Sequence, residues 1–555
     1  MFDELRAIQA IHGYLPTEQL YKLSGKLKKP VSEIHAVASF YPHFYLKPPP
    51  KADVRICADM SCHLMGAMQL RRSVERAFAG RPPAEVSIRD VSCLGRCDTA
   101  PALSINDHIY SSAVPALTVA MIEGAMEGKL PREPSHKRVR QALKADPYDG
   151  PSTYQAVRHF VEGRDFNAVF KALKDSTLRG MGGAGFPTGM KWELVRKTHG
   201  LQKYIVCNAD ESEPGTIKDR FIMESAPHLV IEGMIVAGLV TGATKGFIYI
   251  RHEYEEPREV LQEEIHRCYR EHLLGQGILG SDFSFDLEIF VSPGGYICGE
   301  ESALLEAMEG KRAEPRNKPP FPGTNGLWNA PTVINNVETF AFAAGILVNG
   351  AEWYKNQGVN GIPGLKFVGI SGDVVYPGVY EVPMGVSYRD LIFKYAGGVR
   401  GGKQLLGFAP SGPSSGYLPA SQVDLPLDFK ALAEAGSMVG SGAIVVCAEG
   451  RCMLDMAINS TRFFRNESCG KCVPCRTGSQ KLVDILTRWT RGEPHADDRT
   501  VMDDLFKAMR LTSICGLGQI IHAPVASVIK HFPTVIDEHL KDRRCSAGAC
   551  FPMGA

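Results

Sequence analysis

The sequence predicts a multidomain α/β protein, and three observations support that class. The chain has 555 residues, which exceeds what one hydrophobic core accommodates and corresponds to roughly three or four domains. Apolar residues make up 44% and charged residues 22%, as in ordinary globular proteins. Strand-type runs occur beside helix-type segments in a small unit after residue 50 and again over residues 153 to about 360, and this combination is the pattern of α/β folds.

Charge and hydropathy exclude several function classes. Lys plus Arg is 62 and Asp plus Glu is 61, giving a net charge of +1, so no basic field favours nucleic-acid binding. The longest apolar run, 233–244, is shorter than the about 20 residues that span a bilayer. The acidic start Met1-Phe2-Asp3-Glu4 lacks an apolar signal core. We therefore expect a cytoplasmic chain without a membrane span.

The first part of the chain reads as helices followed by a small α/β unit. Residues 1 to about 50 are helical in pattern and end at three prolines. The unit then has strands at 54–57 and 86–91 with a helix at 65–79 between them. A hairpin is predicted around Asn106-Asp107, between 103–105 and 108–110.

The remaining segments differ in their periodicity. Buried-strand candidates at 204–207 and 246–250 belong to the longest α/β stretch, and strands at 367–370 and 378–382 belong to a β-rich insert. We predict these divisions: 1–130 helices plus α/β unit, 131–152 linker, 153–362 large α/β domain, 363–440 β-rich insert, 441–540 helical domain, 541–555 C-terminal tail.

Two pairs of cysteines follow strands of the small α/β unit. Cys57 and Cys62 are separated by four residues, and Cys93 and Cys97 by three. Four thiolates on two adjacent loops suit a [2Fe–2S] cluster, in which each pair holds a different iron. A zinc site and two incidental pairs of buried thiols are the alternatives. The spacing favours the cluster.

A second set of cysteines has the spacing of a cubane site. Cys469, Cys472 and Cys475 are spaced by two residues, and Cys515 follows forty residues later. Three closely spaced thiolates wrap the backbone around three corners of a [4Fe–4S] cluster, and a distant fourth closes the last corner. Gly470 permits close approach of the chain. A zinc ion bound by the same four cysteines is the alternative.

Fifteen cysteines are too few for a disulfide scaffold in so long a chain, and their odd number points to thiolate ligands. Outside the two sets, Cys207 and Cys298 lie in apolar contexts and are predicted to be packed thiols. Cys545 and Cys550 resemble a ligand pair, but no two partners lie near them in sequence. We therefore predict a flexible tail there rather than a metal site.

A glycine-rich segment, Gly180–Gly185, contains the string G-x-G-x-x-G. Because the preceding residues 166–178 have a helical pattern and not a strand pattern, the ordinary Rossmann arrangement is rejected. The backbone N–H groups of such a loop still bind phosphate. Phe186 and Trp192 lie close by in sequence and could stack on an aromatic ring, and Lys191 could pair with a phosphate. A simple tight turn is the alternative.

Polar, glycine-containing loops recur in the same large α/β domain. The segment 208–215 places three carboxylates after a buried strand, and 294–301 repeats glycines beside acids and an aromatic ring. Asn335-Asn336 adds amide groups. Each segment alone fits a solvated loop, but together they favour a cofactor pocket, because buried polar groups need partners.

With these motifs the chain resembles a fusion of the two flavin-end subunits of respiratory complex I, as also found in soluble NAD-linked formate dehydrogenases and NAD-reducing hydrogenases. The first part resembles the 24-kDa-type subunit, which implies a thioredoxin-like [2Fe–2S] domain. The rest resembles the 51-kDa-type flavoprotein, which implies an FMN-binding α/β domain, a β-grasp-like insert and a helical [4Fe–4S] domain. The implied cluster ligands are Cys57, Cys62, Cys93, Cys97, Cys469, Cys472, Cys475 and Cys515.

The resemblance also implies FMN and NAD contacts, with Glu213 beside the nicotinamide and no catalytic acid or base. They are Gly180, Gly182, Gly183, Phe186, Lys191, Asn208, Asp210, Glu211, Glu213, Tyr296, Gly299, Glu300, Glu301, Lys318, Phe321, Asn335, Asn336 and Thr339. Two positions depart from the family pattern: Met181 replaces an arginine of the glycine loop, and Leu194 replaces an aromatic residue under the adenine.

The implied activity is that of an NAD(H)-linked diaphorase, in which FMN connects two-electron exchange with NAD(H) to single-electron transfer through the clusters. The expected partner is a large catalytic subunit with further iron–sulfur clusters and a molybdenum or tungsten cofactor, as in a soluble formate dehydrogenase. An NAD-reducing hydrogenase and a complex I-like dehydrogenase are alternatives within this class. A zinc-bound structural protein is the alternative outside it.

Overall fold

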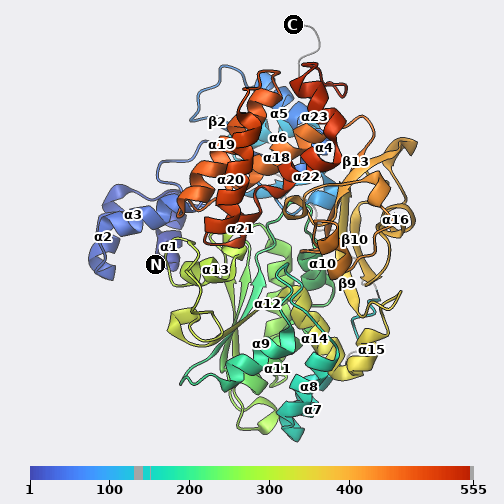
Figure 1. Ribbon diagram of the computed structural model, residues 1–555. Coiled ribbons are helices and arrows are strands. Elements are labelled where there is room, and N and C mark those ends of the chain that lie inside the picture. The colour runs from blue at the N-terminus through green and yellow to red at the C-terminus, as the bar shows by residue number, and fades with distance from the viewer. Residues whose placement is uncertain (131–141, 151, 551–555) are drawn as a thin grey trace.

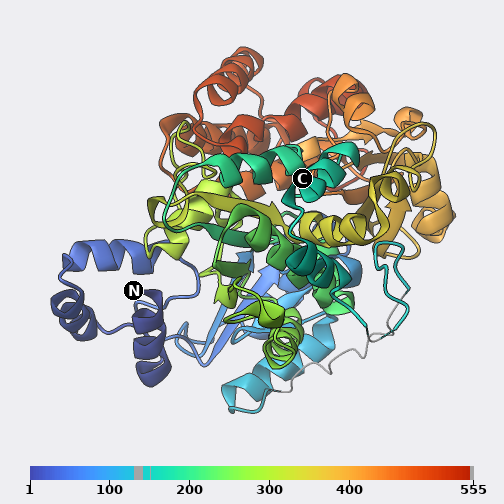
Figure 2. The ribbon, with the colours of Figure 1, turned by 90° about the horizontal axis from the view of Figure 1, so that it is seen from below.

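The computed structural model describes residues 1–130, 142–150 and 152–550, so most of the predicted linker lies outside the described residues. Three helices open the chain: α1 (Phe2–His12), α2 (Thr17–Leu27) and α3 (Val31–Phe40). They stand at one side of the body in both views (Figures 1 and 2). Tyr41 Oη donates to the carbonyl of Lys311 at 2.6 Å, which fastens this arm to the large α/β domain.

The small α/β unit forms a four-stranded sheet in the order β2-β1-β3-β4. Its strands are β1 (Ala52–Cys57), β2 (Val86–Val91), β3 (Leu103–Ile105) and β4 (His108–Tyr110), with helices α4 (Met60–Leu64), α5 (Ala67–Ala77) and α6 (Pro115–Met126). β1 and β2 are parallel, and β3 pairs antiparallel with both β1 and β4. The predicted hairpin is therefore confirmed. The two cysteine pairs lie at the carboxyl ends of β1 and β2.

The large α/β domain is built on a parallel sheet in the order β7-β6-β5-β8. The strands are β5 (Tyr204–Ala209), β6 (Lys245–Ile250), β7 (Asp286–Val291) and β8 (Thr332–Asn336). Successive strands from β5 to β7 extend the sheet in one direction, and β8 then joins on the other side of β5. The order therefore reverses between β5 and β8, and ligands of open parallel sheets bind at such a point.

Helices cover this sheet and set the glycine loop in place. They are α7 (Gln155–Gly163), α8 (Phe166–Asp175), α9 (Thr188–Lys197), α10 (Lys218–Ser225), α11 (Pro227–Thr241), α12 (Glu255–Arg270), α13 (Glu301–Met308), α14 (Val337–Asn349) and α15 (Ala351–Lys355). Gly180–Gly185 connects α8 to α9, so a helix and not a strand precedes the loop. This agrees with the rejection of a Rossmann arrangement.

The β-rich insert forms a five-stranded sheet in the order β10-β9-β13-β11-β12, with helices α16 (Tyr388–Asp390) and α17 (Phe429–Glu434). Its strands are β9 (Leu365–Gly372), β10 (Gly378–Pro383), β11 (Leu405–Ala409), β12 (Leu418–Pro419) and β13 (Ala443–Ala448). The central strand β13 lies beyond residue 440, in the segment that the sequence divides off as helical. β13 pairs with β9 on one side and β11 on the other, so it is a central strand of this sheet, and all of its residues are buried.

The C-terminal helices form a bundle beside the small α/β unit and the β-rich insert (Figure 1). They are α18 (Met453–Asn466), α19 (Val473–Trp489), α20 (Asp498–Thr512), α21 (Gly516–Ile520), α22 (Ala523–His531) and α23 (Pro533–Leu540). Asn459 on α18 accepts from the Met60 amide at 2.8 Å and donates to the carbonyl of Ala58 at 2.7 Å. The bundle and the small α/β unit are thereby joined.

No single helix in the described part of the chain has both the length and the apolar character needed to cross a bilayer. The consecutive helices α10 and α11 reach that threshold only when taken together, across a bend of 92°.

Candidate functional site

A cavity of about 670 Å³ opens beside the carboxyl ends of β5 and β8, where the strand order reverses. Ten of the residues predicted to contact cofactors line it: Gly182, Gly183, Asn208, Asp210, Glu211, Glu213, Tyr296, Gly299, Glu300 and Asn336. They come from four loops that are distant in sequence. A cavity of this size with convergent polar groups has the character of a cofactor site.

The glycine loop approaches the cavity with its backbone. Its ends are closed by a hydrogen bond from the Gly180 amide to the carbonyl of Phe186 at 2.8 Å. A Cβ at Gly182 would lie 3.1 Å from the Cβ of Asn336, and Gly183 has a φ of +124°. Side chains at both positions are therefore disfavoured. Thr339 accepts from the Met181 amide at 2.9 Å, so it holds the loop from behind and does not line the cavity.

The acidic residues after β5 are buried. Asp210 accepts hydrogen bonds from Ser212 at 2.5 Å and Ser292 at 3.0 Å. Glu213 accepts from the Ser414 amide at 3.1 Å. Burial raises the pKa of both Asp210 and Glu213 to about 7, because desolvation disfavours the charged form. These two carboxyl groups therefore titrate near neutral pH and can accept or donate a hydrogen bond inside the cavity.

Glu211 has a structural task as well as a place in the cavity wall. Its carboxylate accepts from the amides of Asp219 at 2.8 Å and Arg220 at 3.0 Å, and from Tyr254 Oη at 2.8 Å. These bonds fix the start of α10 against the cavity. Burial raises the pKa of Glu211 above its ordinary value.

The other predicted contacts lie behind or around the cavity. Asn335 accepts from Trp192 Nε1 at 2.9 Å, and Lys191 Nζ donates to the carbonyl of Ile334 at 3.0 Å. Burial lowers the pKa of Lys191. Outside the lining, the structure places Gly180, Phe186, Lys191, Glu301, Lys318, Phe321, Asn335 and Thr339.

At the rim, Lys318 forms ion pairs with Glu300 at 2.6 Å and Glu301 at 2.9 Å. Phe186 is 47% exposed and Phe321 is 56% exposed. The exposed rings of Phe186 and Phe321 are surfaces on which a nucleotide base can stack, and the ion-paired cluster around Lys318 offers hydrogen-bonding groups. Their roles in nucleotide binding stay predictions.

The first cysteine set converges in the interior. Cys57, Cys62, Cys93 and Cys97 are all buried. The Cys57 thiol contacts those of Cys62 and Cys93, and the sulfurs of Cys93 and Cys97 are 3.5 Å apart. The neighbouring thiols of Cys57 and Cys97, together with Arg251, hold the pKa of Cys93 well below its ordinary value. Four converging buried thiols, on the two segments at the carboxyl ends of β1 and β2, fit a two-iron cluster.

Two buried arginines connect this cysteine set to the cavity. Arg220 donates to the carbonyl of Gly95 at 2.7 Å and to Asp98 at 2.6 Å. Arg251 donates to the carbonyl of Cys93 at 2.6 Å and also bonds the carbonyl of Glu211. Sequence reasoning missed both residues, since an arginine in a helix or after a strand has no distinguishing local signal.

The second cysteine set surrounds a small cavity of its own. Cys469, Cys472, Cys475 and Cys515 line it together with Ile297, Pro315 and Leu517. Ile297 and Leu517 also line the 670 Å³ cavity, so the two spaces share a wall. Lys471 Nζ donates to the carbonyl of Pro315 at 2.7 Å and fixes the cysteine loop. The four sulfurs around one cavity fit a [4Fe–4S] cluster.

The cavity also receives residues that sequence reasoning did not predict. Ser414, Gly440 and Ser441 come from the β-rich insert, and Arg510 and His522 come from the helical domain. The segment Ser411-Gly412-Pro413-Ser414-Ser415-Gly416 is as glycine- and serine-rich as the predicted loops, and that composition was the available signal. For Arg510 and His522, no local sequence pattern indicated a place in the cavity.

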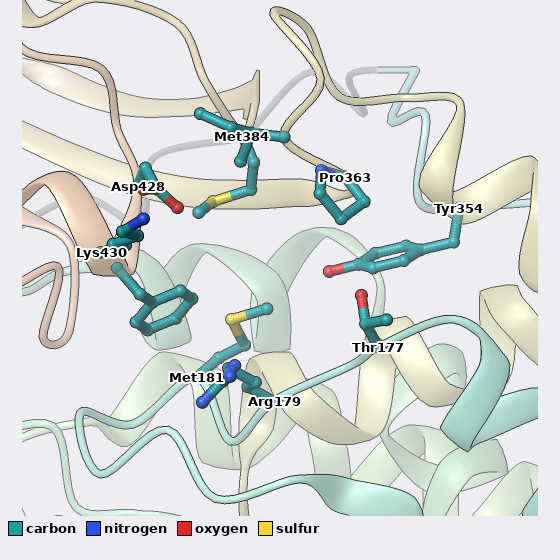
Figure 3. Close-up of a pocket in the computed structure, with 10 residues that line it drawn as sticks. Thr177, Arg179, Met181, Tyr354, Pro363, Met384, Asp428 and Lys430 are labelled. Carbon is teal, nitrogen blue, oxygen red and sulfur yellow. The ribbon is translucent and has the colours of Figure 1, made fainter.

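Met181 does not face the cofactor cavity. Its side chain lies in a second cavity of about 460 Å³, with Arg179, Met384 and Asp428 (Figure 3). The departure from the family pattern at this position therefore falls in the second cavity and not in the cofactor cavity. Leu194 is 47% exposed on α9 and lies next to Gly323.

The premise that Cys545 and Cys550 have no two ligand partners nearby, on which the expectation of a flexible tail rested, is not met in the structure. Both residues lie against Cys452 and His539, with one potential ligand atom from each of the four residues within 4.8 Å of the others. The two partners that seemed to be missing come from positions more than 80 residues apart in sequence. Cys207 and Cys298, in contrast, are packed in the core as predicted.

The fold and these sites define a multidomain oxidoreductase subunit of the flavin and iron–sulfur class. Three family descriptions match the chain: a Nuo51 FMN-binding domain over residues 173–344, a thioredoxin-like [2Fe–2S] ferredoxin over 1–126 and an NADH-ubiquinone oxidoreductase-F iron-sulfur binding region over 455–539. The cofactors expected from the sequence are thus borne out at the level of domains.

Two similar proteins of known name indicate the family within this class of oxidoreductases. The chain is 43% identical over 398 residues to the F 2 subunit of the NADH-quinone oxidoreductase of Rhizobium meliloti, covering 72% of this chain and 94% of the relative. It is 42% identical over 382 residues to the HndC subunit of the NADP-reducing hydrogenase of Solidesulfovibrio fructosivorans, covering 69% and 78%. The chain belongs to the family of the NADH-quinone oxidoreductase F subunits.

A solved structure covers the whole arrangement. An NAD⁺-reducing [NiFe]-hydrogenase in the H₂-reduced state matches with a TM-score of 0.87 and 33% identity, over 97% of this chain and 93% of that one. The predicted multidomain fold, including the thioredoxin-like unit joined to the flavoprotein part, is therefore confirmed.

Proposed function

We propose that this chain is a diaphorase subunit that exchanges electrons between NAD(H) and a catalytic partner through FMN and its two iron–sulfur clusters. The observation that carries the proposal is the shared wall of Ile297 and Leu517 between the 670 Å³ cavity and the second cysteine set. FMN bound in that cavity would supply the conversion between two-electron exchange with NAD(H) and single-electron transfer.

The residues of the chain prepare the cavity for this task. Gly182 and Gly183 let the backbone approach a phosphate-bearing ligand, and Asn208 and Asn336 add amide groups at the strand ends. Glu213 lies on the side of the β-rich insert, where the Ser414 amide holds its carboxyl group in one orientation. We assign Glu213 the role of positioning the nicotinamide. Orientation and exclusion of water are what hydride exchange requires from the protein.

For the reaction of the whole enzyme we propose formate oxidation coupled to NAD⁺ reduction, in the cytoplasm. The support is the fusion of the small α/β unit, with all four cysteines Cys57, Cys62, Cys93 and Cys97, to the flavoprotein part, which resembles soluble NAD-linked formate dehydrogenases. Formate would be oxidised at a molybdenum or tungsten centre on a separate large subunit with further iron–sulfur clusters.

A second candidate is the diaphorase subunit of an NAD-reducing hydrogenase. The observation in its favour is the hydrogenase structure that covers 97% of this chain, which has the same fused arrangement. A complex I-like dehydrogenase has weaker support, because the relatives with that name cover about 70% of this chain.

The experiment is purification of the native complex through a tag on this chain under anaerobic conditions, followed by metal analysis and assays. A formate dehydrogenase yields molybdenum or tungsten with formate-dependent NAD⁺ reduction, whereas a hydrogenase yields nickel with H₂-dependent reduction. The diaphorase assignment itself requires visible flavin and iron–sulfur absorbance and NADH oxidation by small dyes. Colourless protein that contains zinc alone would overturn it.

A further inference from the structure

The C-terminal segment contains a cluster of four potential metal ligands that the redox sites do not use. Cys452 lies in the turn between β13 and α18, His539 lies on α23, and Cys545 and Cys550 lie on the loop that follows α23. One ligand atom from each lies within 4.8 Å of every other. Cys452 and His539 are buried, and Cys545 and Cys550 are half-buried.

The spacing of these atoms matches one tetrahedral ion. The Cys452 sulfur is 3.7 Å from the Cys550 sulfur and 3.6 Å from His539 Nε2. Zinc bonds of about 2.3 Å to sulfur and about 2.05 Å to nitrogen place tetrahedral ligands about 3.8 Å apart for two sulfurs and about 3.5 Å apart for sulfur and nitrogen. One ion fits between atoms at these distances, whereas a four-iron cluster does not.

The histidine is oriented as a ligand. His539 Nδ1 lies 2.7 Å from the carbonyl of Val535, one helical turn earlier on α23. Nδ1–H donates to that carbonyl, and this bond leaves the Nε2 lone pair directed at the cysteines. A second hydrogen bond of this kind is the usual support of a metal-bound imidazole, because it fixes both the tautomer and the ring plane.

The loop is shaped to return its second cysteine to the same point. Gly548 has a φ of +64°, and its amide donates to the carbonyl of Cys545 at 2.9 Å. Glu538 fastens the loop to α23 by accepting from Ser546 at 2.7 Å and pairing with Arg544 at 3.3 Å. These contacts hold the loop so that Cys545 and Cys550 both lie beside Cys452.

We propose that Cys452, His539, Cys545 and Cys550 bind one structural zinc ion. A closed set of three thiolates and one imidazole is a zinc set, and it leaves no position open for a substrate. The ion would tie residues 541–550 to the start of α18, the helix that also contacts the small α/β unit through Asn459. The site is separate from both cluster sites, so the proposal does not depend on the proposed function.

The test is metal analysis of the full chain purified without a polyhistidine tag. We expect about one zinc per chain, and zinc-edge X-ray absorption with three sulfur neighbours and one nitrogen. In the double variant Cys545→Ser/Cys550→Ser we expect that zinc falls below about 0.2 per chain while the iron and FMN content stay within about 20% of the parent protein.

The matched control is Cys268→Ser. It alters a buried thiol that is hydrogen-bonded to Tyr154 and lies outside all three cysteine sets. This variant should keep its zinc. If the double variant fails to fold, the zinc content and absorption spectrum of the unaltered chain decide the matter. Unaltered protein with less than about 0.2 zinc per chain, iron at this site, or a Cys452–Cys550 disulfide found by mass spectrometry would overturn the proposal.

Discussion

The backbone amide of Gly215 donates a hydrogen bond to the sulfur of Cys97 at 3.2 Å. Gly215 belongs to the loop that carries Glu213 into the cofactor cavity, and Cys97 is one of the four cysteines of the small α/β unit. A Cβ at Gly215 would lie 2.8 Å from Val445 on β13. One glycine thus joins a cluster ligand, the cavity loop and the sheet of the β-rich insert.

We predict that Arg220→Ala disturbs the [2Fe–2S] site but leaves flavin binding intact. The variant leaves Asp98 without its buried partner and frees the carbonyl of Gly95, at a cost of about 3 kcal/mol. The measurement is electron paramagnetic resonance of the dithionite-reduced protein together with FMN content. Arg164→Ala is the control, since its pair with Asp282 is exposed and contributes less than about 1 kcal/mol. Identical spectra in the two variants would contradict the prediction.

Cys472→Ser should interrupt electron exit from the flavin. We expect NADH oxidation by small dyes to keep at least half of its rate, because dyes accept electrons at the flavin, while turnover with the catalytic partner falls at least a hundredfold. Steady-state assays of the reconstituted complex measure both rates. Cys447→Ser, at a buried thiol of β13, is the control. Normal turnover of the complex with Cys472→Ser would disprove the proposed route.

Glu301→Gln should relax the choice between NAD and NADP. Glu301 pairs with Lys318 at the rim, and a carboxylate there repels a 2′-phosphate. Without it, the Lys318 ammonium is freer to meet that phosphate. We expect the ratio of kcat/KM for NADPH to that for NADH to rise about tenfold, which corresponds to about 1.4 kcal/mol.

The control for nucleotide choice is Glu314→Gln, which removes a carboxylate paired with Arg312 at 3.2 Å. It should leave the ratio within twofold of the parent protein. An unchanged ratio in Glu301→Gln would remove the assignment of this carboxylate to the ribose.

Glu232 should make stability fall as pH rises. This residue of α11 accepts from Tyr148 Oη at 2.6 Å and from the Ala156 amide at 2.9 Å, and burial raises its pKa to about 7. Because the folded state holds this proton more tightly than the unfolded state, stability from the group is fully present below about pH 4.5 and declines until about pH 7. The full loss is on the order of 3 kcal/mol.

Glu232→Gln removes this titration, so its apparent midpoint of thermal unfolding should gain on that of the parent protein between pH 5 and pH 8. Differential scanning calorimetry at several pH values measures the gap. Glu162→Gln, on an exposed position of α7, is the control. A gap that stays constant with pH would show that Glu232 does not titrate in this range.

The cysteine spacings and polar loops were readable from the sequence because each is a local pattern. Cys469, Cys472 and Cys475 indicate a cluster by spacing alone, and ten of the residues predicted to contact cofactors do line one cavity. The helix before Gly180 was equally local, since it follows from periodicity.

Only the tertiary structure decided what lies between these patterns. The β-rich sheet gains β13 through pairing with β9, a strand about 75 residues earlier. The hydrogen bonds of Arg220 and Arg251 to the segment of Cys93 and Gly95 also join residues that are far apart in sequence. Packing also brings Cys452 and His539 together with Cys545 and Cys550. From the sequence alone we interpreted the segment of Cys545 and Cys550 as a flexible tail. Residue type and spacing fix which atoms can act as ligands, whereas packing decides which of them meet.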